Sequence, residues 1–227
     1  MHETFAPFGP LIYRGDIRGE FNNFLLKHLD SIRQCEDARN MLVGNIEQQR
    51  RTNYPQKEFV DFVDVHVVNY LRDKYQHQLS IDRNIFGGKQ GCKNGSILNP
   101  DEHEIRYHLG EGPWVNFSKK GEFNPMHNHS GVISSVVFID IPEEIEQERD
   151  STTFSAKAAG CLDLIMDNQH IVVKPVSGTI YLFPSYLWHL VYPFHSDVER
   201  ISMSFNIYDL TLDDNVMKSD SYKNYGT

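Results

Sequence analysis

The spacing of apolar residues divides this chain into a helical first part and a stranded second part. Between positions 21 and 32, apolar side chains recur three or four residues apart, which is the period of one helix face. The same spacing from about 56 to 78 predicts a second helix, and a short strand broken by prolines is expected at 5–13. Residues 40–56 and 83–100 are polar and predict irregular structure, in the second case a long loop.

From about position 103 the pattern changes to short apolar runs separated by turn residues. These runs predict strands at 103–109, 113–119, 132–141, 161–166, 170–174, 178–183, 187–193 and 200–208. No helical period separates them, so a closed or two-sheet β structure is expected. Residues 142–159 form a polar excursion that is long for a hairpin loop and predicts a lid or an insert.

The last predicted strand has one polar and one apolar face. Arg200, Ser202, Ser204 and Asn206 alternate with four apolar residues. An isolated surface strand would turn such a polar face to water. This strand, however, directly follows the one that carries His189, so the two are expected to share a sheet. Arg200 and Ser202 would then face the interior of a barrel, and the apolar face would pack under the two N-terminal helices.

Composition sets limits on the class of protein. A chain of 227 residues with 40% hydrophobic residues can form one large domain, 1–227, with a support region at 1–100 and a β core at 103–210. The net charge of −9 argues against general nucleic-acid binding. Three cysteines without a CxxC pair favour a reducing, cytoplasmic compartment, and no apolar run is long enough for a membrane span. The oligomeric state stays open, with a homodimer as one expectation.

Histidines in two separate segments suggest a metal site. Alternate residues of a strand point to the same face, so His127 and His129 can bind one metal, and His189 can approach from a distant strand. A single histidine is more often an ordinary hydrogen-bonded side chain, and that alternative applies to each of the three. A buried arginine beside a serine suits a dicarboxylate, because its guanidinium grips one carboxylate with two charge-assisted hydrogen bonds while the metal takes the other end.

Taken together, the motifs resemble those of the 2-oxoglutarate/Fe(II)-dependent oxygenases, in the bacterial and phage branch related to prolyl hydroxylases. The segments that carry the resemblance are Trp114-Val115-Asn116, Asn124-Pro125-x-His127-x-His129, Ser134-Ser135, Gly178-Thr179 to Phe183-Pro184-Ser185 and His189, and Arg200-Ile201-Ser202-x-Ser204-Phe205-Asn206. The likeness is best over 110–208. It implies a mainly β fold, a double-stranded β-helix or jelly-roll barrel like that of cupins, with the N-terminal helices packed on one sheet.

The resemblance also implies an activity and a set of ligands. The enzyme would be an Fe(II)- and 2-oxoglutarate-dependent dioxygenase that uses O2, hydroxylates an unidentified substrate and releases succinate and CO2, with ascorbate as a reductant. A prolyl or other amino-acid side chain is the first expectation for the substrate. Iron would be bound by His127 and His189, and the far carboxylate of 2-oxoglutarate by Arg200 with Ser202. Asn116 would contact the near end of the cosubstrate.

The third metal ligand departs from the common pattern. Non-haem iron is usually bound by two histidines and one carboxylate, but here the second position of the motif is His129. We expect His129 to be the third ligand. The alternative is that it only lines the pocket. Asp140 lies too far along its strand to take its place.

Cupins are a rival family with the same barrel. Gly121 precedes His127 by six residues, which nearly matches the first cupin motif, but no glutamate follows His129 as that motif requires. A cupin would be a metal-binding protein or a metalloenzyme that does not use 2-oxoglutarate, and it would leave Arg200 and Ser202 unexplained. A purely structural jelly roll would bind neither metal nor cosubstrate. The oxygenase is therefore the preferred prediction.

Overall fold

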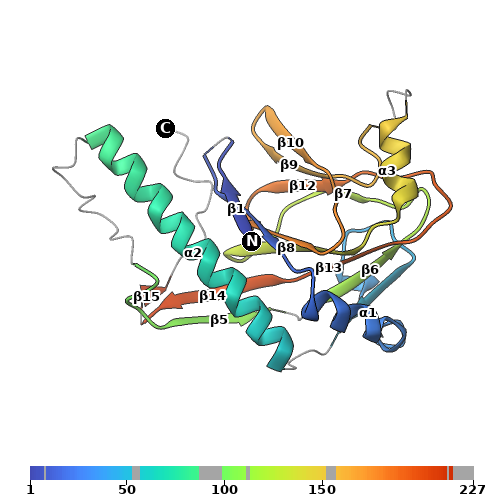
Figure 1. Cartoon of the computed structure of the whole chain (residues 1–227), viewed down its shortest axis with the longest axis horizontal. Helices are drawn as coiled ribbons and strands as arrows, with labels where there is room; N and C mark the ends of the chain where they lie inside the picture. The colour runs from blue at the N-terminus through green and yellow to red at the C-terminus, as the bar shows by residue number, and fades with distance from the viewer. Residues whose placement is uncertain are drawn as a thin grey trace.

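Two antiparallel sheets form a jelly-roll barrel, the expected double-stranded β-helix (Figure 1). The computed structural model describes residues 1–7, 9–52, 57–86, 99–110, 113–151, 157–213 and 215–216. The larger sheet has the order β1 (His2–Phe5), β2 (Ile12–Asp16), β11 (Thr179–Pro184), β8 (Ile133–Asp140), β13 (Arg200–Ser204), β6 (Trp114–Ser118), β4 (Gln48–Arg51) and β3 (Glu36–Asp37). Strand β14 (Asn206–Leu212) belongs to the same sheet but lies outside this linear order. It pairs with β8, β5 (Ile105–Leu109) and β15 (Asn215–Val216).

The smaller sheet carries two of the three candidate histidines. Its order is β10 (Gln169–Val173), β9 (Leu162–Met166), β12 (Trp188–Val191) and β7 (Asn124–His127). Side chains from both sheets, among them Phe138, Leu164 and Phe183, form a buried cluster. Since this cluster fills only part of the space between the sheets, the rest of the barrel interior is available for polar side chains.

Two helices cover the outer face of the larger sheet, as predicted. Helices α1 (Glu20–Ile32) and α2 (Lys57–Phe86) contribute to one core cluster with strands of that sheet. The apolar face of β13 belongs to this cluster, and Met203 is completely buried. Phe205, directly after β13, meets Phe59 of α2 edge to face with ring centroids 5.7 Å apart. The predicted alternation of β13 is therefore confirmed: its apolar side lies under the helices, and its polar side is left to the barrel interior.

The segment 40–56, expected to be irregular, contains the strand β4, and the 3-10 helix η1 (Arg39–Met41) overlaps its start. The sequence of β4 is Gln-Gln-Arg-Arg, which has no apolar alternation, so its extended structure depends on pairing with β6. Strand β7 was also absent from the predicted set. It includes Pro125 and lies at the edge of the smaller sheet, where a proline is tolerated in a strand.

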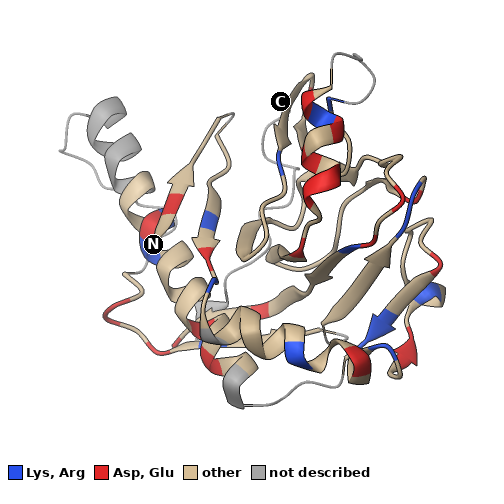
Figure 2. Ribbon diagram, turned by 45° about the vertical axis from the view of Figure 1, so that its right-hand side comes forward, with Lys and Arg blue, Asp and Glu red and all other residues tan. Residues whose placement is uncertain are grey.

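Both long excursions contain helical residues. Helix α2 continues to Phe86, so the start of the predicted loop 83–100 is helical, and its part at 87–98 lies outside the described residues. The excursion 142–159 begins with helix α3 (Glu143–Asp150), whose first turn carries three glutamates (Figure 2). Its residues 152–156 also lie outside the described part of the chain. Within the part that is described, no helix combines the length and apolarity needed to cross a membrane.

Candidate functional site

Three histidine side chains meet at one end of the barrel. His127 of β7 and His189 of β12 are directly paired across the two strands, and their ring centroids are 4.2 Å apart. The ring of His129 lies 4.9 Å from that of His127 and 5.2 Å from that of His189. One nitrogen from each of the three lies within 4.8 Å of the others. The predicted convergence of two separated segments is therefore present.

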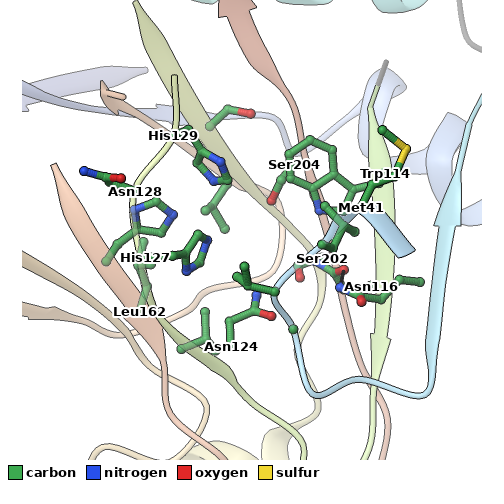
Figure 3. A pocket seen from close by; sticks show the side chains of 18 of the residues that line it. Met41, Trp114, Asn116, Asn124, His127, Asn128, His129, Leu162, Ser202 and Ser204 are labelled. Carbon is green, nitrogen blue, oxygen red and sulfur yellow. Dashed lines mark hydrogen bonds between the residues drawn. The ribbon is translucent and has the colours of Figure 1, made fainter. Parts of the chain in front are cut away.

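His129 reaches this cluster in a different way from the one expected. Strand β7 ends at His127, so His129 lies in the connection that follows and is not the i+2 residue of a strand. Its backbone N–H donates to the carbonyl oxygen of Ser185 at 3.0 Å, which ties this connection to the end of β11. The connection still brings the imidazole of His129 beside that of His127, as Figure 3 shows, and close to that of His189.

Hydrogen bonds set the tautomers of the two strand histidines. Nδ1 of His127 lies 2.7 Å from the carbonyl oxygen of Pro125, and Nδ1 of His189 lies 3.0 Å from that of Leu187. A carbonyl oxygen can only accept, so each Nδ1 carries the hydrogen and each Nε2 keeps a lone pair. This is the arrangement that metal-binding histidines commonly show.

Burial keeps the three imidazoles neutral. Loss of hydration lowers the pKa of His189 to about 3 and that of His129 to about 4, with a smaller contribution from neighbouring histidines. Burial also lowers the pKa of His127. Metal binding requires unprotonated imidazole, so at neutral pH the cluster needs to release no proton before it binds a cation.

A single cavity joins the histidines to the other predicted site residues (Figure 3). Its volume is about 110 Å³. Arg200 and Ser202 project into it from β13, and Asn116 projects from β6, where it is the paired neighbour of Ser202. The lining residues include no aspartate or glutamate, and Asp140 is not among them. All six predicted site residues thus border one cavity, while their roles remain predictions.

Arg200 is the most unusual polar group in this cavity. It is 2% exposed, and its Nε and Nη2 atoms have no hydrogen-bond partner in the described part of the chain. Its guanidinium lies 5.3 Å from the centroid of the Phe138 ring. Burial lowers the pKa of Arg200 to about 10, so the group is still charged at pH 7. A buried cation without a partner is costly, and an anion bound in the cavity would remove that cost.

Gln49 is a cavity residue that sequence reasoning missed. It is 1% exposed on β4, and its Nε2 donates to Oδ1 of Asn116 at 2.8 Å. This bond fixes the amide of Asn116 and leaves its Nδ2 side as a donor. A Cβ at Gly44 would lie 2.3 Å from Oδ1 of Asn124 and 2.8 Å from Nε2 of Gln49, so a larger residue there would displace these two side chains. No sequence signal pointed to Gln49, because β4 lacks the pattern of a half-buried strand.

Comparison with known proteins agrees with this site. Residues 112–206 match the model of the family described as "Putative 2OG-Fe(II) oxygenase". No curated protein matches the chain. The matched residues include strands β6 to β13 and the first residue of β14, and with them all three histidines, Arg200, Ser202 and Asn116.

Solved structures show a likeness at low sequence identity. The carbocyclase SnoK from nogalamycin biosynthesis, a non-haem α-ketoglutarate-dependent enzyme, aligns with a TM-score of 0.50 and 9% identity over 89% of this chain and 81% of its own. A Pseudomonas putida prolyl-4-hydroxylase aligns with a TM-score of 0.46 and 16% identity, over 87% of this chain and 91% of its own. A Trichoplax adhaerens prolyl hydroxylase aligns with a TM-score of 0.48 and 15% identity, over 87% of this chain and 83% of its own. The SnoK alignment shows a common fold, and the family model covers the segment that holds the predicted site residues. Residues 112–206 of this chain, which hold all of the candidate site residues, therefore match the 2OG-Fe(II) oxygenase family.

Proposed function

We propose that this protein is a hydroxylase that binds Fe(II) through His127, His129 and His189 and anchors 2-oxoglutarate at Arg200. The observation that carries the proposal is the position of Arg200. Two nitrogens of its buried guanidinium, Nε and Nη2, have no hydrogen-bond partner among the described residues, and Arg200 lines the same cavity as three neutral imidazoles. A cation site and a fixed positive group in one cavity suit a ligand with a carboxylate at each end, and 2-oxoglutarate is such a ligand.

The donor set fits an iron centre. Imidazole is a ligand for Fe(II), although zinc, copper and nickel also accept it. Bound iron would supply the activation of O2 that is coupled to the conversion of 2-oxoglutarate to succinate and CO2. Three neutral imidazoles leave the centre one charge more positive than two imidazoles and a carboxylate would. That extra charge favours an anionic cosubstrate.

The remaining polar residues would orient the cosubstrate. Nε and Nη2 of Arg200 can take both oxygens of the far carboxylate, and the Ser202 hydroxyl can donate a further hydrogen bond. Asn116 would donate from Nδ2 to the near end, because Gln49 already occupies its Oδ1. The protein's part is to hold the cosubstrate in one orientation and to exclude water from it.

A cupin-type metal-binding protein accounts for less of the cavity. It would use the three histidines but gives no reason for a buried arginine in the same cavity whose Nε and Nη2 lack a partner in the part of the chain that is described. We infer that the substrate is hydroxylated on an aliphatic carbon, with a prolyl or other amino-acid side chain as the first expectation. Ascorbate as reductant, a cytoplasmic location and a homodimer all stay predictions.

Succinate formation tests the proposal. Purified protein supplied with Fe(II), ascorbate, O2 and 2-oxoglutarate is expected to form succinate slowly without added substrate, and a chelator should abolish this turnover. Arg106→Gln is a suitable control, because it removes an exposed charge on β5 that pairs with Glu104, outside the cavity. Iron uptake without either 2-oxoglutarate binding or succinate formation would contradict the proposal and favour the cupin alternative.

A further inference from the structure

A second cavity of about 110 Å³ adjoins the histidine cluster, and a buried asparagine forms part of its wall. Met41, Leu42, Trp114 and His129 line both this cavity and the first one. His129 therefore stands between the two, and a molecule in the second cavity would lie directly beside the proposed metal centre. Asn206 lines the second cavity and not the first.

The alternation along β13 and β14 turns the Asn206 side chain toward the barrel interior. Arg200 and Ser204 line the first cavity from the inward face of β13, and Asn206 continues this row at the start of β14. Its two chain neighbours, Phe205 and Ile207, belong instead to the apolar cluster under the helices. Successive residues on one face are about 7 Å apart, so Asn206 lies three such steps from Arg200. A ligand anchored at Arg200 would therefore leave Asn206 to another molecule.

The side-chain amide of Asn206 is a buried donor and acceptor without a partner. Asn206 is 9% exposed, and its side chain makes no hydrogen bond in the part of the chain that is described. Its backbone carbonyl oxygen, by contrast, accepts from the N–H of Gly110 at 3.2 Å, and the residue pairs with Ser134 of β8. The Ser134 hydroxyl donates to that of Ser185. Because a buried amide without hydrogen bonds is costly, a ligand that supplies them here would be stabilised.

Aromatic rings supply the apolar walls of the second cavity. The Trp114 ring meets that of His129 edge to face, with centroids 6.2 Å apart (Figure 3). The ring of Tyr208 packs directly against the backbone at Gly110, where a Cβ would overlap it. Its hydroxyl lies 3.5 Å from that of Ser130. These contacts hold the Tyr208 ring in place, and no aspartate or glutamate lines the cavity.

We propose that the second cavity binds the primary substrate through Asn206, and that this substrate carries a primary carboxamide on an aliphatic body. A primary carboxamide has its oxygen and one N–H on the same side of a plane, so it can pair with Nδ2 and Oδ1 of Asn206 at once. The aliphatic body would extend between Trp114 and Tyr208 toward His129. The side chains of asparagine and glutamine have this chemistry. That the bound molecule is a substrate rests on the proposed oxygenase function.

Other polar groups match the Asn206 amide less well. A carboxylate offers acceptors alone, so it would accept from Nδ2 but place a second lone pair against Oδ1. A trans peptide group has its N–H and its carbonyl oxygen on opposite sides, so one such group satisfies one of the two atoms. The primary carboxamide satisfies both atoms and brings no further charge into a buried site.

A neutral amide and its isosteric ketone test this inference. Isovaleramide and isobutyl methyl ketone differ by an NH2 in place of a CH3, so both carry the carbonyl oxygen but the ketone cannot donate to Oδ1 of Asn206. Both are uncharged, so the charge of Arg51 in the cavity wall favours neither. Calorimetric titrations would use protein with Fe(II) and 2-oxoglutarate but without O2, and again protein without either ligand. We expect the amide to bind at least about tenfold more tightly, because the ketone leaves Oδ1 buried and unpaired.

Variants assign the preference to Asn206. Asn206→Leu removes both polar atoms and should reduce the difference between amide and ketone to within about twofold. Asn206→Asp keeps the shape but loses the donor, so it should bind isovaleramide about tenfold more weakly than the wild type. Asn23→Leu makes the same change as Asn206→Leu at an exposed position of α1, and it should leave the difference unchanged. Far-UV circular dichroism checks the fold of each variant.

Three results would overturn the inference. They are equal binding of the two probes to the wild type, no measurable binding of isovaleramide, and an amide preference that survives in Asn206→Leu. A separate titration of the same protein with 2-oxoglutarate reports on the proposed function. Protein that binds isovaleramide through Asn206 but fails to bind 2-oxoglutarate would contradict the proposed function and leave the amide site in place, so the two failures are distinguishable.

Discussion

Replacing Arg200 with methionine is expected to weaken 2-oxoglutarate binding by about 100-fold or more, and also to stabilise the ligand-free protein. The loss of affinity follows because breaking a buried ion pair costs about 3–5 kcal/mol when one charge is left alone. The gain in stability follows because methionine fills a similar volume without a charge. Exchange of buried ionic groups for apolar ones often stabilises a protein by about 1–4 kcal/mol.

The direction of the pKa shift of Arg200 supports the expected gain in stability of the methionine variant. Burial lowers the pKa of Arg200 from its ordinary value to about 10, so the charged form is less favourable in the folded state than in the unfolded chain. A lowered pKa on a cationic group means that the cost is fully present below about pH 10 and decreases as the pH rises through that value. At pH 7 the ligand-free protein therefore carries the whole cost, and methionine removes it.

Calorimetric titration and chemical denaturation measure the two effects. Arg200→Lys is the matched variant, because it keeps the positive charge but loses the two-pronged grip, and it should bind 2-oxoglutarate with intermediate affinity and show no stabilisation. A methionine variant that is less stable than the wild type and binds 2-oxoglutarate normally would show that Arg200 has a structural role.

Replacing His189 or His127 with alanine is expected to lower metal affinity by at least about 100-fold, because even the outer-shell partners of metal ligands account for about 10- to 100-fold. His189 is 5% exposed, and its ring centroid lies 4.2 Å from that of His127. Among the described residues, the group that could hold a metal here consists of the three histidines, so the loss of one has no evident replacement. Competition with a chromophoric chelator measures the affinity, and the far-UV circular dichroism of each variant checks its fold.

Variants of His129 test whether this residue is the third metal ligand or only lines the cavity. If His129 is a ligand, His129→Ala should lose as much metal affinity as the His189 and His127 alanine variants. His129→Asp should keep most of the metal affinity, because it supplies the carboxylate found in the usual triad. Wild-type affinity in His129→Ala would show that His129 only lines the cavity. Wild-type affinity in His189→Ala would contradict the metal site itself.

The sequence was informative wherever one side of an element packs against a core. The alternation at 200–208 correctly predicted the apolar face of β13 under the helices, because burial on one face imposes a period of two. The two N-terminal helices were predicted for the equivalent reason. The convergence of His127 and His189 needed the fold of the family as well, since no local rule brings segments about sixty residues apart together.

The features that sequence reasoning missed are determined by tertiary contacts. Gln49 enters the cavity because β4 pairs with β6, and the polar sequence of β4 carries no sign of that pairing. The alternation of side chains along a strand predicted that His129 would lie beside His127. The two do lie together, but His129 is beyond the end of β7, so strand alternation is not the cause. Arg51 and Tyr208 line one further cavity although their strands are far apart in the sequence. Such positions follow from strand register, which no single segment encodes.

Anaerobic titration of Fe(II)-loaded protein with 2-oxoglutarate, glutarate and pyruvate tests the central claim most directly. Glutarate lacks the 2-oxo group that would chelate the metal, and pyruvate lacks the far carboxylate that would pair with Arg200. We expect 2-oxoglutarate to bind most tightly and each truncated ligand to bind at least about tenfold more weakly. The Arg200→Met variant should bind pyruvate as the wild type does. Pyruvate that binds as tightly as 2-oxoglutarate would contradict the account.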